Sequence, residues 1–235
     1  MNNAIRLACA ASAFLTLAAT GLAETEILRS RLNGCAAFDR RMAEVTRLDK
    51  AAEYSWDALA TPEAARARQE ELRGKFAAAI GGFPERTPLE PSVRGVVRRD
   101  GYRIEKLTFA SRPHHHVTAH LFLPEDPKFA APYPAILIAC GHSGNGKASR
   151  NYQRACVQGV KAGFAVLIYD PIDQGERTQL PDTDKKNVGG HVHLGMRAHL
   201  LGWSTAQFRI WDGMRAIDYL ETRPEVDASR IGMIG

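Results

Sequence analysis

The sequence predicts an α/β fold in which antiparallel strands come first and parallel strands with flanking helices follow. Short alternating segments at residues 93–123 are separated by turn residues, which is typical of a meander of antiparallel strands. Two continuous apolar runs then follow at residues 134–140 and 164–169, with a helical pattern between them. This order is typical of parallel strands that helices cover on both faces.

The composition is that of a globular chain. Of its 235 residues 45% are hydrophobic, and there is no repeat or low-complexity tract, so the chain can bury a substantial core. The net charge of +5 is spread along the chain among acidic residues, with no basic patch interleaved with aromatic residues. A nucleic acid is therefore not an expected partner.

The first 23 residues differ from the rest. A short start with one cation, Arg6, precedes an apolar run at residues 7–20, and small residues follow up to Ala23. This pattern predicts a secretory signal peptide that is cut after Ala23. The apolar run is shorter than the ~20 residues that span a bilayer. We therefore expect a secreted or periplasmic protein that has no membrane partner after cleavage.

Residues 24–91 are predicted to form a helical segment in front of the sheet. Thr61 can cap a helix, Pro62 suits the first turn, and apolar residues recur every four positions from Leu72 to Ile80. A pair of glycines at 81–82 ends the run. The chain thus divides into a leader (1–23), a helical segment (24–91) and a sheet domain (92–235).

Within residues 92–235 the boundaries of several elements can be predicted. Asp100-Gly101 suits a tight hairpin turn, and Pro124 closes the strand that begins near residue 117. Helices are expected at about 148–162 and 204–221, the second with Ser204 as its N-cap and Pro224 beyond its end. A last strand opens at about residue 230, and its apolar end is expected to form a partly unpaired, aggregation-prone edge.

The last five residues, IGMIG, predict a strand that enters a nucleophile elbow. In the elbow motif G-x-S-x-G, a serine lies on a sharp turn between a strand and a helix, and its acid and histidine partners come later in the chain. Gly235 would be the first glycine of that motif, so the nucleophile is expected just after Gly235 and no catalytic residue within residues 1–235. An ordinary terminal strand is the alternative.

Five stretches of the sequence together resemble one superfamily of enzymes. They are FPERTPL from residue 83, RDGYRIEKLTFASRP from 99, CGHSGNGK from 140, YDPIDQGER from 169 and RIWDGMRAIDYLETRPEVDASRIG from 209. In this order they resemble the α/β-hydrolase superfamily, and within it the branch of secreted acetyl xylan esterases and dienelactone-hydrolase-like proteins. The resemblance implies that residues 92–235 are a partial α/β-hydrolase domain and are inactive alone.

The resemblance also implies an activity. Such proteins hydrolyse carboxylic esters with a serine nucleophile and need no cofactor. The implied substrate is an acylated carbohydrate such as acetylated xylan, or a small ester. Two alternatives stay open: a peptidase similar to prolyl oligopeptidase, and a carbohydrate-binding protein without catalysis. The sequence does not predict the oligomeric state.

The turn at Gly141, His142, Ser143 and Gly144 is the candidate oxyanion-hole loop. It follows an apolar strand and precedes a helix, where hydrolases of this type place a backbone N–H that stabilises the developing oxyanion. We expect His142 or Ser143 to supply that N–H.

A rival interpretation makes Ser143 itself the nucleophile, because residues 141–145 nearly match G-x-S-x-G. It requires an acid and a histidine downstream; the candidates are Asp170 or Asp173 and His191 or His193. The last position of the motif is Asn145 rather than glycine, and the family pattern places the nucleophile one strand and helix further on. The turn at 141–144 is therefore favoured as the oxyanion loop.

Other polar clusters are predicted to be structural. Asp170, Asp173 and Glu176 follow an apolar strand, and Gly175 permits a bend there. The histidines at 114–116 and 120 lie on a turn and a strand, where neighbouring side chains point to alternate faces. Neither they nor the histidines at 191 and 193 have a cysteine or carboxylate at metal-site spacing, so no metal is expected. A series of charges on the last helix is expected to form surface ion pairs that fix the helix: Arg209, Asp212 and Arg215.

Three cysteines follow the leader: Cys35, Cys140 and Cys156. An odd number argues against a disulfide scaffold. Cys140 ends a predicted strand and Cys156 lies in the next helix, so a local bridge is possible. Buried free thiols are the favoured alternative.

Overall fold

A computed structural model describes residues 36–57, 59–179 and 190–235 of the chain. The chain divides into two compact units, residues 1–70 and 71–235. The predicted leader and Cys35 lie outside the described residues. None of the helices in the described ranges combines the length and the apolar character that crossing a membrane requires.

Two helices precede the sheet: α2 (Ala36–Asp57) and α3 (Pro62–Ala79). The predicted cap of α3 is confirmed, because the Thr61 hydroxyl accepts a hydrogen bond from the N–H of Ala64 at 3.2 Å. Gly81 and Gly82 adopt positive φ angles of 94° and 72° just after the helix. The helical part is shorter than predicted, since residues 82–91 form neither helix nor strand.

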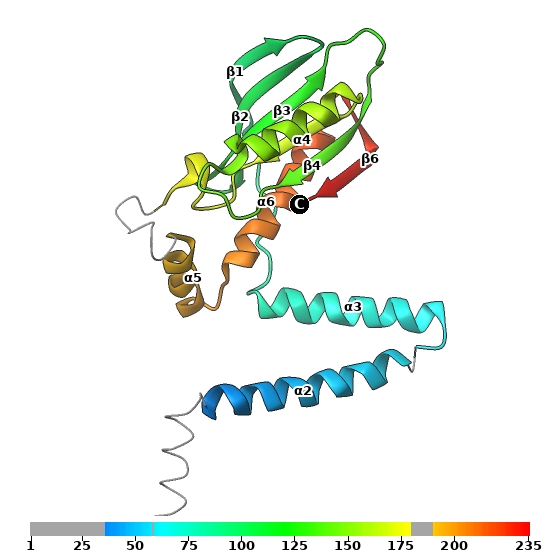
Figure 1. The fold of residues 1–235 in the computed structure, drawn as a ribbon, viewed down its shortest axis with the longest axis vertical. Helices are drawn as coiled ribbons and strands as arrows, with labels where there is room; N and C mark the ends of the chain where they lie inside the picture. Colours follow the sequence, from blue (N-terminus) through cyan, green and yellow to red (C-terminus); the bar gives the residue numbers. More distant parts are fainter. Residues whose placement is uncertain (1–35, 58, 180–189) are drawn as a thin grey trace, which may run out of the picture. The chain divides into compact units, whose positions relative to one another are not determined.

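The second unit contains a mixed sheet of six strands in the order β1-β2-β3-β5-β4-β6 (Figure 1). The first three strands and β5 are joined by antiparallel pairings, and β4 is parallel to both β5 and β6. The predicted change from antiparallel to parallel strands is therefore confirmed. The strands are β1 (Ser92–Arg99), β2 (Tyr102–Arg112), β3 (His115–Pro124), β4 (Tyr133–Ala139), β5 (Ala165–Tyr169) and β6 (Val226–Ile234).

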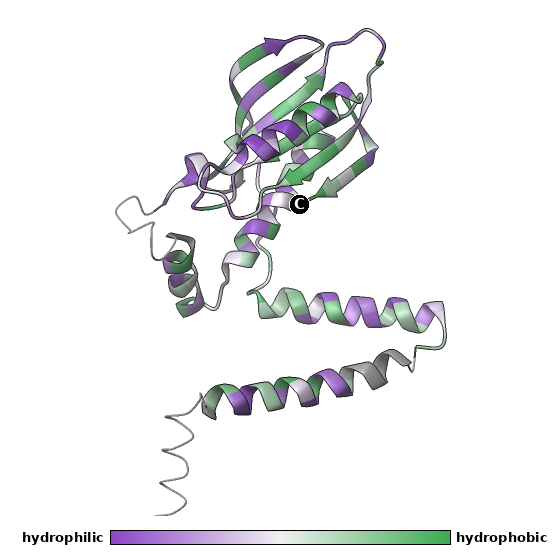
Figure 2. Ribbon diagram, in the orientation of Figure 1, coloured by the Kyte–Doolittle hydropathy of each residue, from purple (hydrophilic) through white to green (hydrophobic). Residues whose placement is uncertain are grey.

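Helices α4 (Arg150–Lys161) and α6 (Thr205–Glu221) cover opposite faces of this sheet. Successive residues of a strand point to opposite faces. On β3, Leu121 belongs to the core cluster that contains Tyr219 of α6, whereas Phe122 belongs to the cluster that contains Val160 of α4. Both helices occupy their predicted places, and Figure 2 shows the buried strand β4 in hydrophobic colours along its length.

Three shorter elements complete the unit: η1 (Gly146–Ala148) after β4, η2 (Gly175–Arg177) after β5, and α5 (Gly190–Leu200). The sequence analysis did not predict α5. At one edge of the sheet β6 pairs with β4 only, and Met233 and Ile234 are more than half exposed. The predicted apolar edge is thus present.

Candidate functional site

The glycine-containing turn at 141–144 leaves the carboxyl end of β4. Its backbone is held from two sides. The N–H of Gly141 donates to the hydroxyl of Tyr152 in α4 at 2.6 Å, and the N–H of Ser143 donates to Oε1 of Gln174 at 2.5 Å. The turn is therefore fixed between α4 and the loop that follows β5.

An apolar cavity of about 450 Å³ lies at the carboxyl ends of the parallel strands and includes Cys140, the residue just before this turn. Its wall includes the carboxyl ends of all three parallel strands, through Cys140, Tyr169 and Met233, and one flank of α6. Ligands of open α/β sheets bind outside the carboxyl ends of the strands. Gly235 also lies here: a Cβ at this position would approach the carbonyl oxygen of Ala139 to 3.2 Å. The predicted oxyanion loop and the predicted start of the elbow thus lie at the same edge of the sheet.

A buried carboxylate, Asp170, ties together the loops behind the turn. The Lys147 ammonium forms an ion pair with it, and the Lys147 N–H donates to Oδ1 at 2.8 Å. The Thr118 hydroxyl and the Glu176 N–H donate to Oδ2 at 2.7 and 3.2 Å. Asp170 is fully buried and Lys147 is 3% exposed. This carboxylate has the predicted structural role, and its partner Lys147 was not predicted.

Two glycines make room for Asp170. Gly146 and Gly175 have positive φ angles of 51° and 58°. A Cβ at these positions would come within 2.0 and 2.3 Å of Oδ1 of Asp170. Both positions therefore require glycine, which explains the predicted bend at Gly175.

A second buried carboxylate, Asp212, lies on α6. Arg177 Nη1 donates to its Oδ2 at 2.7 Å, and the Ser111 hydroxyl donates to its Oδ1 at 2.6 Å. Arg177 Nη2 also lies 2.7 Å from Nε2 of His115, and because arginine can only donate, this ring nitrogen accepts. Burial acts to raise the pKa of Asp212, but the charge of Arg177 and the hydrogen bond from Ser111 outweigh it and lower this pKa below 3.8.

The predicted surface pairing of the α6 charges is wrong for Asp212 and Arg215. Asp212 is fully buried and Arg215 is 4% exposed. Arg215 donates to the carbonyl oxygen of Thr87 and to Asp218. Periodicity placed these charges beside the apolar stripe of the helix, but it could not show that distant segments supply their partners. Their predicted role in fixing the helix agrees with these contacts.

The rival assignment of Ser143 as the nucleophile has no support in the hydrogen bonds. Among the described residues, none bonds to the hydroxyl of Ser143. Both oxygens of Asp170 are already occupied, and Asp173 Oδ1 accepts the N–H of Gln179 at 2.9 Å. His193 lies in α5, and the side chain of His191 is outside the described part.

The remaining histidines lie apart. His114 is on the turn between β2 and β3 with a φ of 59°, His115 contacts Arg177, and His120 faces a separate cavity. Within residues 36–57, 59–179 and 190–235, no group of three His, Cys, Asp or Glu side chains is arranged to hold a metal ion.

Cys140 and Cys156 are free thiols, so the local bridge is not formed. Burial raises the pKa of both thiols to about 12. Both therefore stay protonated at neutral pH and are poor nucleophiles.

The strand order, the helices on opposite faces and the turn after β4 define the class of this protein. It has the fold of an α/β hydrolase. The chain belongs to the Abhydrolase family, whose model matches residues 41–235. The match begins well before residue 83, where the recognisable motifs start, so it includes both α3 and most of α2.

Several known proteins are similar. A Bacillus subtilis (strain 168) protein named "Putative hydrolase YtaP" is 24% identical over 178 residues, which cover 70% of this chain and 55% of that protein. A crystal structure described as a "putative acetyl xylan esterase", from Bacteroides fragilis NCTC 9343, matches with a TM-score of 0.62 and 24% identity, over 74% of this chain and 47% of the other. The methylesterase BT1017 matches with a TM-score of 0.56 and 22% identity, over 80% and 40%. The chain thus spans about half the length of these relatives, and the predicted α/β-hydrolase resemblance is confirmed.

Proposed function

We propose that this chain is part of a serine hydrolase of carboxylic esters whose substrate is an acylated carbohydrate such as acetylated xylan. One observation carries the proposal: the turn at 141–144, the end of β6 at Gly235 and an apolar cavity lie together at the carboxyl edge of the parallel strands. The similarity to a protein described as a "putative acetyl xylan esterase" supports the substrate class. The leader pattern at residues 1–23 supports export.

Each part has a chemical role in this proposal. A serine on the turn after β6 attacks the ester carbonyl, and backbone N–H groups of the turn at 141–144 donate to the oxyanion that forms. One such donor typically lowers the barrier by about 2.7–4 kcal/mol. Cys140, Tyr169 and Met233 line the apolar cavity that receives the acyl group.

Gln174 controls one of the candidate donors. Its Oε1 holds the N–H of Ser143, and its Nε2 is buried with no hydrogen-bond partner among the described residues. The Ser143 N–H can therefore donate to a substrate oxygen only after its hydrogen bond to Gln174 Oε1 is broken. If His142 is the donor, Gln174 instead holds the loop in position.

The test begins with the reading frame that encodes the chain, sequenced beyond the codon for Gly235. We expect it to complete x-S-x-G. The full product is then assayed with 4-nitrophenyl acetate and with acetylated xylan, and a fluorophosphonate probe followed by peptide mass spectrometry identifies the nucleophile. The probe should label the serine after Gly235, and changing that serine to alanine should abolish hydrolysis.

Ser143→Ala is the matched control, and it should keep most of the esterase activity because it retains the backbone N–H. A label on Ser143 would support the rival assignment. A product that hydrolyses neither ester would overturn the proposed function. Amino-terminal sequencing of protein recovered outside the cytoplasm checks cleavage after Ala23.

A further inference from the structure

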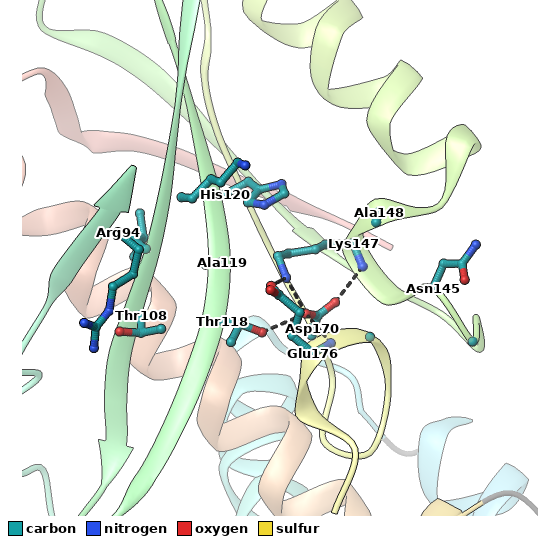
Figure 3. A pocket seen from close by; sticks show the side chains of 14 residues that line it. Arg94, Thr108, Thr118, Ala119, His120, Asn145, Lys147, Ala148, Asp170 and Glu176 are labelled. Atoms are coloured by element: carbon teal, nitrogen blue, oxygen red, sulfur yellow. Dashed lines mark hydrogen bonds and ion pairs between the residues drawn. The ribbon is translucent and has the colours of Figure 1, made fainter. Parts of the chain in front are cut away.

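A polar cavity of about 560 Å³ lies on the α4 face of the sheet, and Gly144 of the turn at 141–144 lies in its lining (Figure 3). Strands β1–β3 form one wall, and the loops that carry Lys147 and Glu176 form the other. Its volume is that of a typical small-ligand site. Its polar lining includes Arg94, Lys106, Thr108, His120, Asn145 and Glu176.

The strand register brings the polar side chains of this wall together. Lys106 of β2 lies directly opposite His120 of β3, and Thr108 lies opposite Thr118. Directly opposed residues share one face of a sheet. Arg94 lies at a bulge, where the pairing of β1 with β2 shifts between Val93 and Gly95. Bulges redirect side chains, and here Arg94 lines the cavity.

The cavity has a cationic side and an acidic side. Within the described ranges, neither Arg94 nor Lys106 has an ion-pair partner. Lys147, in contrast, is neutralised by Asp170 and Glu176. Figure 3 shows Arg94 and Asn145 on opposite sides of the cavity. An anionic group would therefore be attracted to the Arg94 side, and hydroxyl groups could donate to Glu176 on the other side.

His120 presents an unused polar atom between these two sides. Its Nδ1 is buried and has no hydrogen-bond partner among the described residues. Burial, followed by the charge of Lys147, lowers the pKa of His120 to about 4, so the ring is neutral at neutral pH. A buried polar atom without a partner destabilises the folded state. Because Nδ1 has almost no accessible surface, a ligand hydroxyl would remove that penalty once the His120 ring turns toward the cavity.

We propose that this cavity binds a ligand of monosaccharide size that carries a carboxylate or a phosphate. Its anionic group lies between Arg94 and Lys106, and its hydroxyl groups bond to His120 and Glu176. Strand register and the bulge bring Arg94 and Lys106 to this wall, and both side chains are exposed. This binding does not depend on the proposed ester hydrolysis.

The test is isothermal titration calorimetry of the full product, used in the esterase assay, with four probes: glucuronate, glucose 6-phosphate, glucose and inorganic phosphate. At least one acidic sugar should bind more tightly than glucose and more tightly than inorganic phosphate. Which of the two binds identifies the anionic group. No binding of either acidic sugar, or equal binding of glucose, would overturn the proposal.

Two single variants test the cations. Arg94→Ala and Lys106→Ala should each weaken binding of the acidic sugar roughly tenfold or more, because each removes a charge-assisted hydrogen bond. Arg99→Ala is the matched control, since Arg99 is also an exposed arginine of β1 but does not line the cavity. If Arg99→Ala weakens binding as much as Arg94→Ala, only general charge attraction is at work and the proposed site is wrong.

Thermal unfolding of His120 variants, with and without the acidic sugar, distinguishes ligand binding by His120 from a purely structural role. His120→Phe should leave the thermal midpoint of the ligand-free chain unchanged or higher, because it removes a polar atom without a partner. It should also abolish the rise in midpoint that the acidic sugar produces. His120→Asn, whose amide can take the place of Nδ1, should restore that rise. A His120→Phe variant with an undiminished rise would contradict the proposal.

Discussion

Asp170 and Asp212 are two fully buried carboxylates with different surroundings. Each forms an ion pair with one buried cation, Lys147 or Arg177, and each of these cations is 3% exposed. Asp170 accepts three further hydrogen bonds and lies in the wall of the polar cavity. From the part of the chain that the structure describes, Asp212 accepts one further hydrogen bond, from Ser111, and it lies inside the contact of α6 with the sheet.

The two carboxylates differ in the hydrogen-bond donors that they keep when the cation is removed. A buried charge is tolerated when hydrogen bonds satisfy it, and backbone donors persist when a side chain is changed. Two of the three further donors to Asp170 are backbone N–H groups, of Lys147 and Glu176. We infer that Asp212 depends on its arginine more strongly than Asp170 depends on its lysine.

The largest expected effect is that of Arg177→Met. It leaves the Asp212 charge buried without its cation, and breaking a buried pair in this way costs about 3–5 kcal/mol of stability. The free energy of unfolding, measured in urea, checks this value. The double change Arg177→Met with Asp212→Leu should recover much of the loss, because it removes both charges. A double variant that is less stable than Arg177→Met would show that the pair does not act as a unit.

Lys147→Met should have a smaller effect, of about 1–3 kcal/mol, because Asp170 keeps three donors. The same urea experiment measures it. The exposed pair of Arg230 with Asp227 supplies the control, and Arg230→Met should change stability by less than about 1 kcal/mol. If Lys147→Met proves as harmful as Arg177→Met, the remaining donors to Asp170 do not compensate for the lost charge.

The pH dependence of stability tests the contribution of Asp212 directly. The pKa of Asp212 is lowered in the folded chain, so its contribution to stability is full above its ordinary pKa of 3.8 and is lost as the pH falls through the folded value. Unfolding measured below pH 4 should therefore show a smaller loss of stability in Asp212→Asn than in the unaltered chain. Equal slopes in the two proteins would mean that Asp212 does not contribute to acid unfolding.

Much of the fold could be predicted because its signals are local. The Asp100-Gly101 turn, the apolar runs of β4 and β5 and the Ser204 cap each depend on residues close together in the chain. Helix α5 was not predicted although Val192, Met196 and Leu200 recur every four residues, and in the structure these apolar side chains are exposed.

The candidate site was predictable only in part. The turn at 141–144 and the position of Gly235 depend on short motifs, and the structure places both at one edge of the sheet. The pairs of Lys147 with Asp170 and of Arg177 with Asp212 join residues 23 and 35 positions apart. Such pairs depend on strand order, which the local sequence does not contain. The polar cavity depends similarly on the register of Lys106 with His120.

The smallest expected effect lies at the start of the helix that carries Asp212. The hydroxyl of Ser204 caps α6 by accepting the N–H of Gln207 at 3.4 Å, and the same N–H also reaches the Ser204 carbonyl at 3.1 Å. Because the cap bond is long and shared, Ser204→Ala should cost about 0.5–1 kcal/mol of stability, at the low end for N-caps. Ser204→Asp, which keeps a capping oxygen, should cost less.

Since α6 lies on the face opposite the polar cavity, Ser204→Ala should leave ligand binding in that cavity unchanged, whereas Lys147→Met should weaken it. Equal losses of binding in these two variants would mean that the two faces are coupled and that the contrast between Asp170 and Asp212 is not local.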